Sequence, residues 1–127
     1  MGFLRSSAVS DRRAAQRQLV AYRLDVTADE GCSGCLLDLS TTGMRVRFKA
    51  GLDLGSTRHL RIDFPRWLEL GAGLELSGRF VWMRTRPDGA TEAGFAFDGL
   101  SHKEESLLTV LIQRLAEALV EDAAASE

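Results

Sequence analysis

The sequence predicts a mainly β protein, a six-stranded antiparallel β-barrel followed by a C-terminal α-helix. Three observations support this prediction. Six strand-like segments lie between residues 20 and 97, the hydrophobic period changes from strand to helix after Gly99, and the 127 residues are enough for one domain with its own core. Closing the strands into a barrel leaves no exposed sheet edge, so we expect a closed barrel.

The first half of the barrel is expected to contain three strands. Apolar residues at every second position over residues 20–26 indicate a half-buried strand. A second strand is expected to end near Asp38, where the stretch DLSTTG forms a turn that closes on Gly43. The alternation of apolar and basic residues over 44–49 then indicates a third strand.

The second half of the barrel is expected to contain the other three strands. Residues 60–64 alternate in polarity, and Pro65 ends that strand. Residues 74–86 form a long strand that we expect to be bent or bulged near Gly78, because its alternation gives way to nearly continuous apolar character. The stretch RPDGA indicates a hairpin, from which the EAGFAF strand returns.

The C-terminal part of the chain is expected to be helical over residues 101–120. Ser101 and Glu104 have the spacing of a capping box, and the leucines that follow form one apolar stripe. This stripe must cover either the barrel or a partner protein, and packing on the barrel is the simpler expectation. Residues 121–127 form an acidic tail that we expect to be frayed.

Charge separates the first residues from the rest of the chain. The net charge of −2 argues against a protein that binds a nucleic acid polymer through bulk electrostatics. Residues 1–17 nevertheless contain four arginines against one aspartate, and they have little apolar content beyond Phe3 and Leu4. We therefore expect a flexible basic arm at residues 1–18, ahead of a barrel at residues 19–100, all within one domain.

Membrane insertion and export are not expected. The sequence has no apolar run that approaches the roughly 18 residues of a membrane span. The first residues also lack the long apolar segment of a signal peptide. We therefore expect a cytoplasmic protein.

The sequence does not predict an enzyme. His59 and His102 have no neighbours at the spacing of a metal site or a catalytic triad, and we expect both at the surface. Phosphate-binding loops, dinucleotide fingerprints and paired-carboxylate motifs are absent from the sequence, so neither a metal nor a cofactor is expected.

Cys32 and Cys35 have the C-x-x-C spacing of redox pairs and of half a zinc site. A zinc site would need two further ligands, and a thioredoxin-like pair would open a helix rather than lie between two strands. We interpret the cysteines as incidental or weakly redox-active, and a redox protein stays a minor alternative.

Two short motifs carry the functional prediction. Arg13 and Arg17 form R-x-x-x-R, and Asp38, Ser40 and Gly43 form D-x-S-x-x-G. Taken separately, these residues could be solvated arginines and an ordinary turn-capping pair. Taken together and in this order, they resemble the PilZ domain, the bacterial receptor module for cyclic di-GMP. The resemblance extends from near residue 10 to residue 119 and includes the GRFVWMR strand, the AGFAF strand and the terminal helix.

The resemblance implies a role for each motif residue. Arg13 and Arg17 would clamp guanine and phosphate, since an arginine fork can meet the guanine O6 and N7 atoms, stack on a purine or pair with phosphate. Asp38 and Ser40 would form a polar shelf on which the carboxylate accepts hydrogen bonds from the guanine N1 and N2 donors. Gly43 would keep the turn tight.

Two further residues are weaker candidates for this site. Arg12 directly precedes the arginine motif and could reach a second, stacked ligand molecule, or it could simply be solvated. Trp82 lies in a strand that, by the resemblance, often supplies an aromatic side chain near the base, but it fits a core position equally well.

The sequence therefore predicts a non-enzymatic cyclic di-GMP receptor that signals to an unidentified protein partner. Binding is expected to order the N-terminal arm and so change the surface that the partner contacts. The main alternative is a PilZ-like protein-interaction module that binds no nucleotide. The motifs leave open the partner, the oligomeric state and whether one or two ligand molecules bind.

Overall fold

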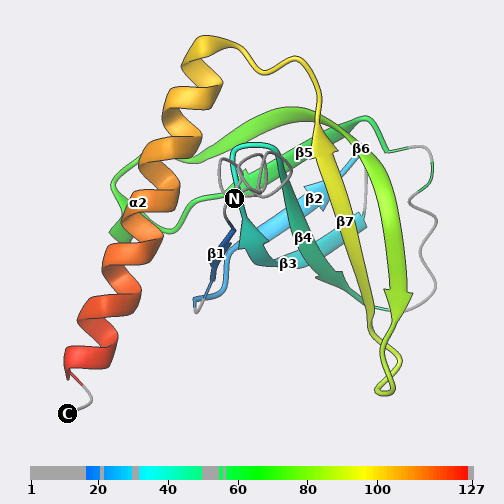
Figure 1. Cartoon of the computed structure of the whole chain (residues 1–127), viewed down its shortest axis with the longest axis horizontal. Helices are drawn as coiled ribbons and strands as arrows, with labels where there is room; N and C mark the ends of the chain where they lie inside the picture. Colours follow the sequence, from blue (N-terminus) through cyan, green and yellow to red (C-terminus); the bar gives the residue numbers. More distant parts are fainter. Residues whose placement is uncertain (1–16, 21, 30–31, 50–54, 56, 126–127) are drawn as a thin grey trace, which may run out of the picture.

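The computed structural model describes residues 17–20, 22–29, 32–49, 55 and 57–125, and these form a barrel with one helix beside it (Figure 1). The strands are β1 (Gln18–Leu19), β2 (Asp25–Ala28), β3 (Cys32–Leu39), β4 (Gly43–Phe48), β5 (His59–Asp63), β6 (Gly73–Thr85) and β7 (Thr91–Phe97). They follow the order β1-β3-β2-β5-β6-β7-β4, all antiparallel, and a further pairing of β3 with β4 closes the barrel. The predicted six-stranded antiparallel barrel with a C-terminal helix is confirmed, with β1 as an additional short strand.

The alternation of the strands separates an inner face from an outer face. In β4, Met44, Val46 and Phe48 are buried inside the barrel, whereas Arg45 and Arg47 between them face outward. Apolar side chains of β2, β3, β5, β6 and β7 fill the same interior, which makes one continuous core. The outer face of β3, β4, β6 and β7 is thus free to carry polar side chains.

Helix α2 (His102–Ala125) closes the core from one side. Leu108, Leu111 and Leu115 are buried in the same core cluster as the barrel residues, which confirms that the apolar stripe packs on the barrel. The helix lies along the side of the barrel next to β1 (Figure 1). The side chain of Arg114 also donates a hydrogen bond to the carbonyl oxygen of Leu68, in the short 3-10 helix Arg66–Leu68.

The helix begins as predicted and ends later than predicted. The Ser101 amide donates to the Glu104 carboxylate at 2.8 Å, and the Glu104 amide donates to the Ser101 hydroxyl at 3.0 Å, which is a complete capping box. The helix continues to Ala125, past the expected end at residue 120. The alanines at 123–125 have the highest helix propensity of all residues, which favours this extension.

The strand expected over residues 20–26 is wrong in its extent. β1 ends at Leu19 and β2 begins only at Asp25, although both pair with β3. Between these two pairings the first segment has three more residues than β3 has, and the chain bends at Tyr22. Tyr22 in this bend stacks edge-on against Trp67, with ring centroids 5.1 Å apart, and its hydroxyl donates to the carbonyl oxygen of Ala118 at 3.4 Å. Packing against the helix therefore overrides the local alternation.

A β-bulge in β3 changes which face Asp38 occupies. Leu36 pairs with Val46 and Asp38 pairs with Arg45, so Leu37 is an extra residue in β3. Leu36 faces the core, and in a regular strand the residue two positions later would face the core as well. The bulge reverses the alternation, so Asp38 lies on the outer face opposite Arg45.

A second bulge does the same in β6. Phe80 pairs with Phe95 and Trp82 pairs with Gly94, which leaves Val81 as the extra residue. Phe80 packs inward against Phe95, so a regular strand would bury Trp82, whereas the bulge turns its side chain outward. The irregularity expected near Gly78 is therefore present, three residues further along the strand.

Candidate functional site

The two bulges place four residues in one row across the outer face. Asp38 of β3 lies opposite Arg45 of β4, Arg45 lies opposite Gly94 of β7, and Gly94 lies opposite Trp82 of β6. Residues directly opposite each other in antiparallel strands have their side chains on the same face and within contact distance. The row therefore joins the D-x-S-x-x-G motif to the tryptophan of the GRFVWMR strand, although Trp82 lies 44 positions after Asp38 in the chain.

Asp38 lies between two arginines. Arg17 Nη1 donates to Asp38 Oδ1 at 2.9 Å, and Arg45 Nε lies 2.9 Å from Asp38 Oδ2. The second contact is an ion pair without the alignment of a hydrogen bond, since the buried Nε of Arg45 has no hydrogen-bond acceptor. The Asp38 side chain is only 6% exposed, compared with 48% for Arg17 and 30% for Arg45. The carboxylate is thus shielded from water, and Arg17 is its more exposed partner.

Glu92 of β7 is a second shielded carboxylate on this face. It accepts hydrogen bonds from Arg84 at 2.9 Å and from Arg86, and Arg45 Nη1 lies 3.5 Å from it. Burial of the carboxylate acts to raise the pKa of Glu92, but the hydrogen bonds from Arg86 and Arg84 outweigh burial and lower the pKa below its ordinary value. Arg45 therefore links the Asp38 pair to the Glu92 cluster.

This linked group of side chains carries an excess of positive charge. Four arginines, Arg17, Arg45, Arg84 and Arg86, face the two carboxylates, so the net charge of the group is +2. Two buried arginine nitrogens, Nε of Arg45 and Nε of Arg86, also lack a hydrogen-bond acceptor. A polyanion at this face would meet arginine charge that the protein itself does not neutralise.

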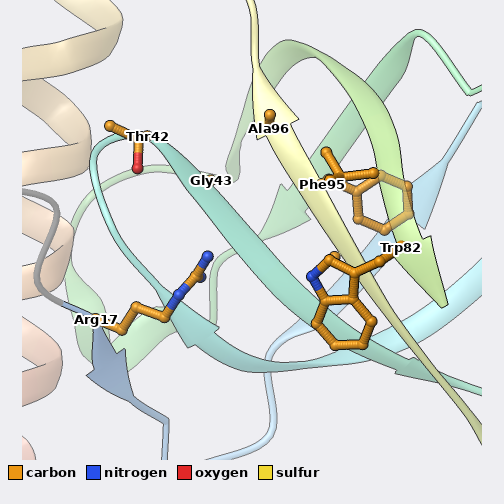
Figure 2. A pocket seen from close by; sticks show the side chains of 8 residues that line it. Arg17, Thr42, Gly43, Trp82, Phe95 and Ala96 are labelled. Atoms are coloured by element: carbon orange, nitrogen blue, oxygen red, sulfur yellow. The ribbon is translucent and has the colours of Figure 1, made fainter. Parts of the chain in front are cut away.

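A hollow of about 230 Å³ lies beside the arginine–aspartate pair. Its lining consists of Arg17, Thr42, Gly43, Val81, Trp82, Gly94, Phe95 and Ala96. Figure 2 shows the guanidinium of Arg17 and the indole of Trp82 on opposite sides of the hollow, each extending toward its middle. The exposed fraction of Trp82 is 39%, so its ring is open to a ligand.

Two glycines keep the space around the hollow open. A Cβ atom at Gly94 would overlap the indole of Trp82, and a Cβ atom at Gly43 would overlap the carbonyl oxygen of Phe95 on the neighbouring strand. Gly43 is therefore required by the close approach of β4 to β7. A side chain at Gly94 would displace the tryptophan from its position over the strand.

Ser40 shapes the turn of the motif. It is fully buried, its Oγ accepts hydrogen bonds from the amides of Thr42 and Gly43 at 3.2 Å each, and its own amide donates to the Gly43 carbonyl at 2.9 Å. Among the predicted residues, Arg17, Gly43 and Trp82 line the hollow, whereas Asp38 lies behind Arg17 and Ser40 lies in the turn. Arg12 and Arg13 lie outside the described residues, as does most of the predicted arm.

Arg45, Glu92 and Gly94 were not identified from the sequence. In the sequence, Arg45 is one of the polar residues expected on the outer side of an alternating strand. Glu92 and Gly94 are ordinary members of the strand that returns from the hairpin. Only the pairing register of β3, β4, β7 and β6 brings them to the candidate site.

The cysteines cannot act as a pair in this fold. Cys32 pairs with buried Ala28 and packs against the core, whereas Cys35 pairs with Asp25 and lines a groove on the outer face. Three positions apart in one strand, the two thiols point to opposite faces. Both cysteines are free, and within the described residues no group of three or more His, Cys, Asp or Glu could hold a metal ion.

The two histidines lie at the surface, as expected. His59 Nε2 is 3.1 Å from Glu75 Oε1 on the neighbouring strand, and this hydrogen bond is the largest cause that lowers the pKa of Glu75. His102 is exposed in the first turn of α2. For the described part of the chain, no helix has the length and apolar character needed to cross a membrane.

Comparison with known proteins identifies one family. The model of the PilZ domain matches residues 11–114 of this chain. A search of the curated proteins found no match.

The fold is similar to several solved structures. YcgR from Escherichia coli in complex with c-di-GMP has a TM-score of 0.72 at 20% identity, over 91% of this chain and 51% of that one. The PilZ domain of YcgR with c-di-GMP has a TM-score of 0.72 at 17% identity, over 89% and 98% of the two chains. The Bacillus subtilis inhibitor of motility MotI/DgrA has a TM-score of 0.61 at 18% identity, over 84% and 51%. The chain thus spans about half the length of YcgR and of MotI/DgrA.

Proposed function

Because the chain belongs to the PilZ domain family, we propose that it is a bacterial receptor that binds cyclic di-GMP at the hollow beside Arg17 and Asp38. The observation that carries this proposal is the Arg17–Asp38 ion pair next to an open tryptophan. Two structural neighbours, YcgR and its PilZ domain, were solved with the same ligand, which supports the choice of ligand.

The charge of the site suits a cyclic dinucleotide. The arginine and carboxylate group on the outer face has a net charge of +2, and the ligand carries two phosphates with one negative charge each. Arginine also suits the guanine edge, since its fork can donate to the O6 and N7 atoms together. The indole of Trp82 offers a flat surface on which a base can stack.

The size of the hollow sets how the ligand would lie. At about 230 Å³ it is smaller than the roughly 300–1,000 Å³ of typical small-molecule sites, so it would hold one base and its neighbourhood rather than the whole dinucleotide. The rest of the ligand would be covered by the N-terminal arm, where Arg13 would contact a guanine or phosphate and Arg12 could reach a second ligand molecule.

We infer that this arm transmits ligand binding to a protein partner. Residues 1–16 contain few large apolar side chains, so ordering them depends on what they bind. Docking of Arg13 and Arg17 on the ligand would cover the barrel face and create a new surface for a protein partner. Hydrogen exchange tests this step, because amides of residues 8–18 should slow on ligand addition much more than those of α2. Equal exchange with and without saturating ligand would rule the arm out as the switch.

The proposed receptor does not consume its ligand. The residues around the hollow include no arrangement of nucleophile and general base in the described structure. Intact cyclic di-GMP should therefore be recovered after long incubation with the protein. Because this ligand is an intracellular second messenger, the proposal also places the chain in the cytoplasm.

One observation favours a second candidate function. Arg17 and Arg45 already neutralise Asp38, with one guanidinium beside each carboxylate oxygen, as they would in a PilZ-like module that uses this face only to contact proteins. Calorimetric titration separates the two functions. A receptor should bind cyclic di-GMP with a dissociation constant near 1 μM or below, about −8 kcal/mol, and cyclic di-AMP much more weakly. No heat of binding with cyclic di-GMP would favour the interaction module.

A further inference from the structure

The position of Arg17 raises a question about how a ligand could reach Asp38. Arg17 lines the hollow and Asp38 does not, so the arginine lies between the carboxylate and any base in the hollow. If the guanine edge is to donate to Asp38, Arg17 must move from the carboxylate to the ligand. A shielded carboxylate that lost its cation would be unfavourable, so a second cation has to stay beside it.

Arg45 has the position to be that second cation. It lies directly opposite Asp38 in the strand pairing, 2.9 Å from Oδ2, and its side chain is less exposed than that of Arg17. Arg45 Nη1 also lies 3.5 Å from Glu92, a carboxylate that Arg84 and Arg86 hold on the other side. Arg45 is thus anchored on both sides, whereas Arg17 precedes the two-residue strand β1.

The contact between Arg45 and Asp38 leaves acceptor capacity free. Each carboxylate oxygen can accept about two hydrogen bonds. Arg45 Nε lies close to Oδ2 without an aligned hydrogen bond, so Oδ2 can accept a guanine N–H while the ion pair persists. When Arg17 moves away, Oδ1 becomes available to the second guanine donor as well.

We propose that Arg45 is the positioning residue of the site, anchored by Glu92, which holds Asp38 in place when Arg17 exchanges the carboxylate for the ligand. This inference rests on the proposed function and adds to it a residue that decides base selectivity. Arg45 would contact Asp38 rather than the ligand. Its loss should therefore reduce the preference for guanine, because a displaced Asp38 no longer meets the N1 and N2 donors that adenine lacks.

Calorimetry with cyclic di-GMP and cyclic di-AMP tests the inference on the wild-type protein and on two matched variants. Arg45→Gln removes the positioning cation, and Arg47→Gln removes an equal charge from the same face of the same strand, where Arg47 pairs with exposed Asp88. We expect Arg45→Gln to lose about tenfold or more in affinity for cyclic di-GMP. Its preference for cyclic di-GMP over cyclic di-AMP should fall by a similar factor. Arg47→Gln should stay within about twofold of the wild type.

Two additional variants separate positioning from folding. Arg45→Lys restores the positive charge, but an ammonium group cannot contact Asp38 and Glu92 together as the guanidinium does. This variant should therefore recover part of the affinity that Arg45→Gln loses. If Arg45→Gln does not fold, Glu92→Gln tests the same network by removing the anchor of Arg45, and it should lower selectivity by a smaller factor.

Each outcome of these titrations decides a separate point. If the wild type binds cyclic di-GMP and Arg45→Gln has the same affinity and selectivity, the role of Arg45 would be overturned and the receptor function would stand. Equal losses in Arg45→Gln and Arg47→Gln would also overturn it, since they would indicate a general effect of charge. If the wild type itself did not bind cyclic di-GMP, the proposed function would fail, and the inference would fail with it.

Discussion

Asp38 and Glu92 are two shielded carboxylates on the same outer face, and they share Arg45, but their other partners differ. Glu92 is held by Arg84 and Arg86, which belong to the same β6–β7 hairpin and lie only eight and six positions away. Asp38 is held by Arg17, which lies 21 positions away, before the first strand, and lines the hollow. Partners within one hairpin form together with the fold, whereas a partner from outside the barrel can be exchanged. We therefore interpret Glu92 as structural and Asp38 as functional.

Charge reversal at Arg17 should produce the largest effect that separates the two carboxylates. Arg17→Glu places a negative charge beside Asp38 and opposite the ligand phosphates, so affinity for cyclic di-GMP should fall by at least about 100-fold. The thermal midpoint should fall only moderately, because Arg17 is half exposed, lies outside the six barrel strands and leaves Arg45 beside Asp38. Arg23→Glu is the matched control, since Arg23 forms an exposed pair with Asp25 away from the hollow. Similar binding losses in both variants would argue against a specific role for Arg17.

Replacing the exposed tryptophan should produce the next largest effect on binding. Trp82→Ala removes the surface on which a base would stack, which contributes about 1–3 kcal/mol, so affinity should fall by about 5- to 150-fold. Trp67→Ala is the control, because Trp67 is also exposed but packs against Tyr22 beside the helix. Unchanged affinity in Trp82→Ala would place the base elsewhere on the barrel.

The structural carboxylate should have a larger effect on stability than on binding. Glu92→Gln leaves Arg84 and Arg86 without a charged acceptor, and we expect the free energy of unfolding at neutral pH to fall by about 1–3 kcal/mol. Glu75→Gln, at an exposed carboxylate that pairs with Arg61 and His59, should have a much smaller effect. Urea denaturation of both variants provides the comparison. Equal stability of Glu92→Gln and the wild type would remove the structural role.

The same carboxylate predicts a dependence of stability on pH. The pKa of Glu92 is lowered in the folded state, so its stabilising contribution is present above the ordinary value of 4.5 and is lost as the pH falls through the lowered folded value. The wild type should therefore lose stability as the pH falls from 4.5 toward the lowered folded value, and Glu92→Gln should lose less over the same interval. If the stability of the two proteins falls in parallel as the pH is lowered, other carboxylates cause the loss of stability in acid.

The cysteines should produce the smallest effect of all. Cys32 and Cys35 lie on opposite faces of β3, and neither lines the hollow, so serine at both positions should leave ligand affinity within about twofold. Mass spectrometry of the oxidised wild type should find no disulfide between them. An intramolecular bond would contradict the strand assignment at this point.

The comparison also shows what the sequence could reveal and what it could not. Alternating polarity predicted the barrel, and the capping box predicted the start of the helix, because both are local signals. The bulge in β3 was hidden, because Leu36 and Leu37 are both apolar and the stretch does not show where the alternation reverses. The bulge in β6 was predicted near Gly78 but not located, because the residues from Phe80 to Met83 are all apolar. The pairing of Arg45 with Asp38 and Glu92 depends on strand register, which the sequence does not display. Tyr22 broke a regular alternation through its contacts with Trp67 and the helix.

A crystal structure of the complex with cyclic di-GMP would show directly whether Arg17 exchanges Asp38 for the ligand, because it reports the partners of both carboxylates at once. We expect Asp38 to accept hydrogen bonds from guanine N1 and N2, Arg17 to have moved to the ligand, and Arg45 to stay beside Asp38. Glu92 should keep Arg84 and Arg86 as its partners. A bound ligand that leaves the Arg17–Asp38 pair intact would contradict the exchange of Arg17, and one that draws Arg45 away from Asp38 would contradict the positioning role of Arg45.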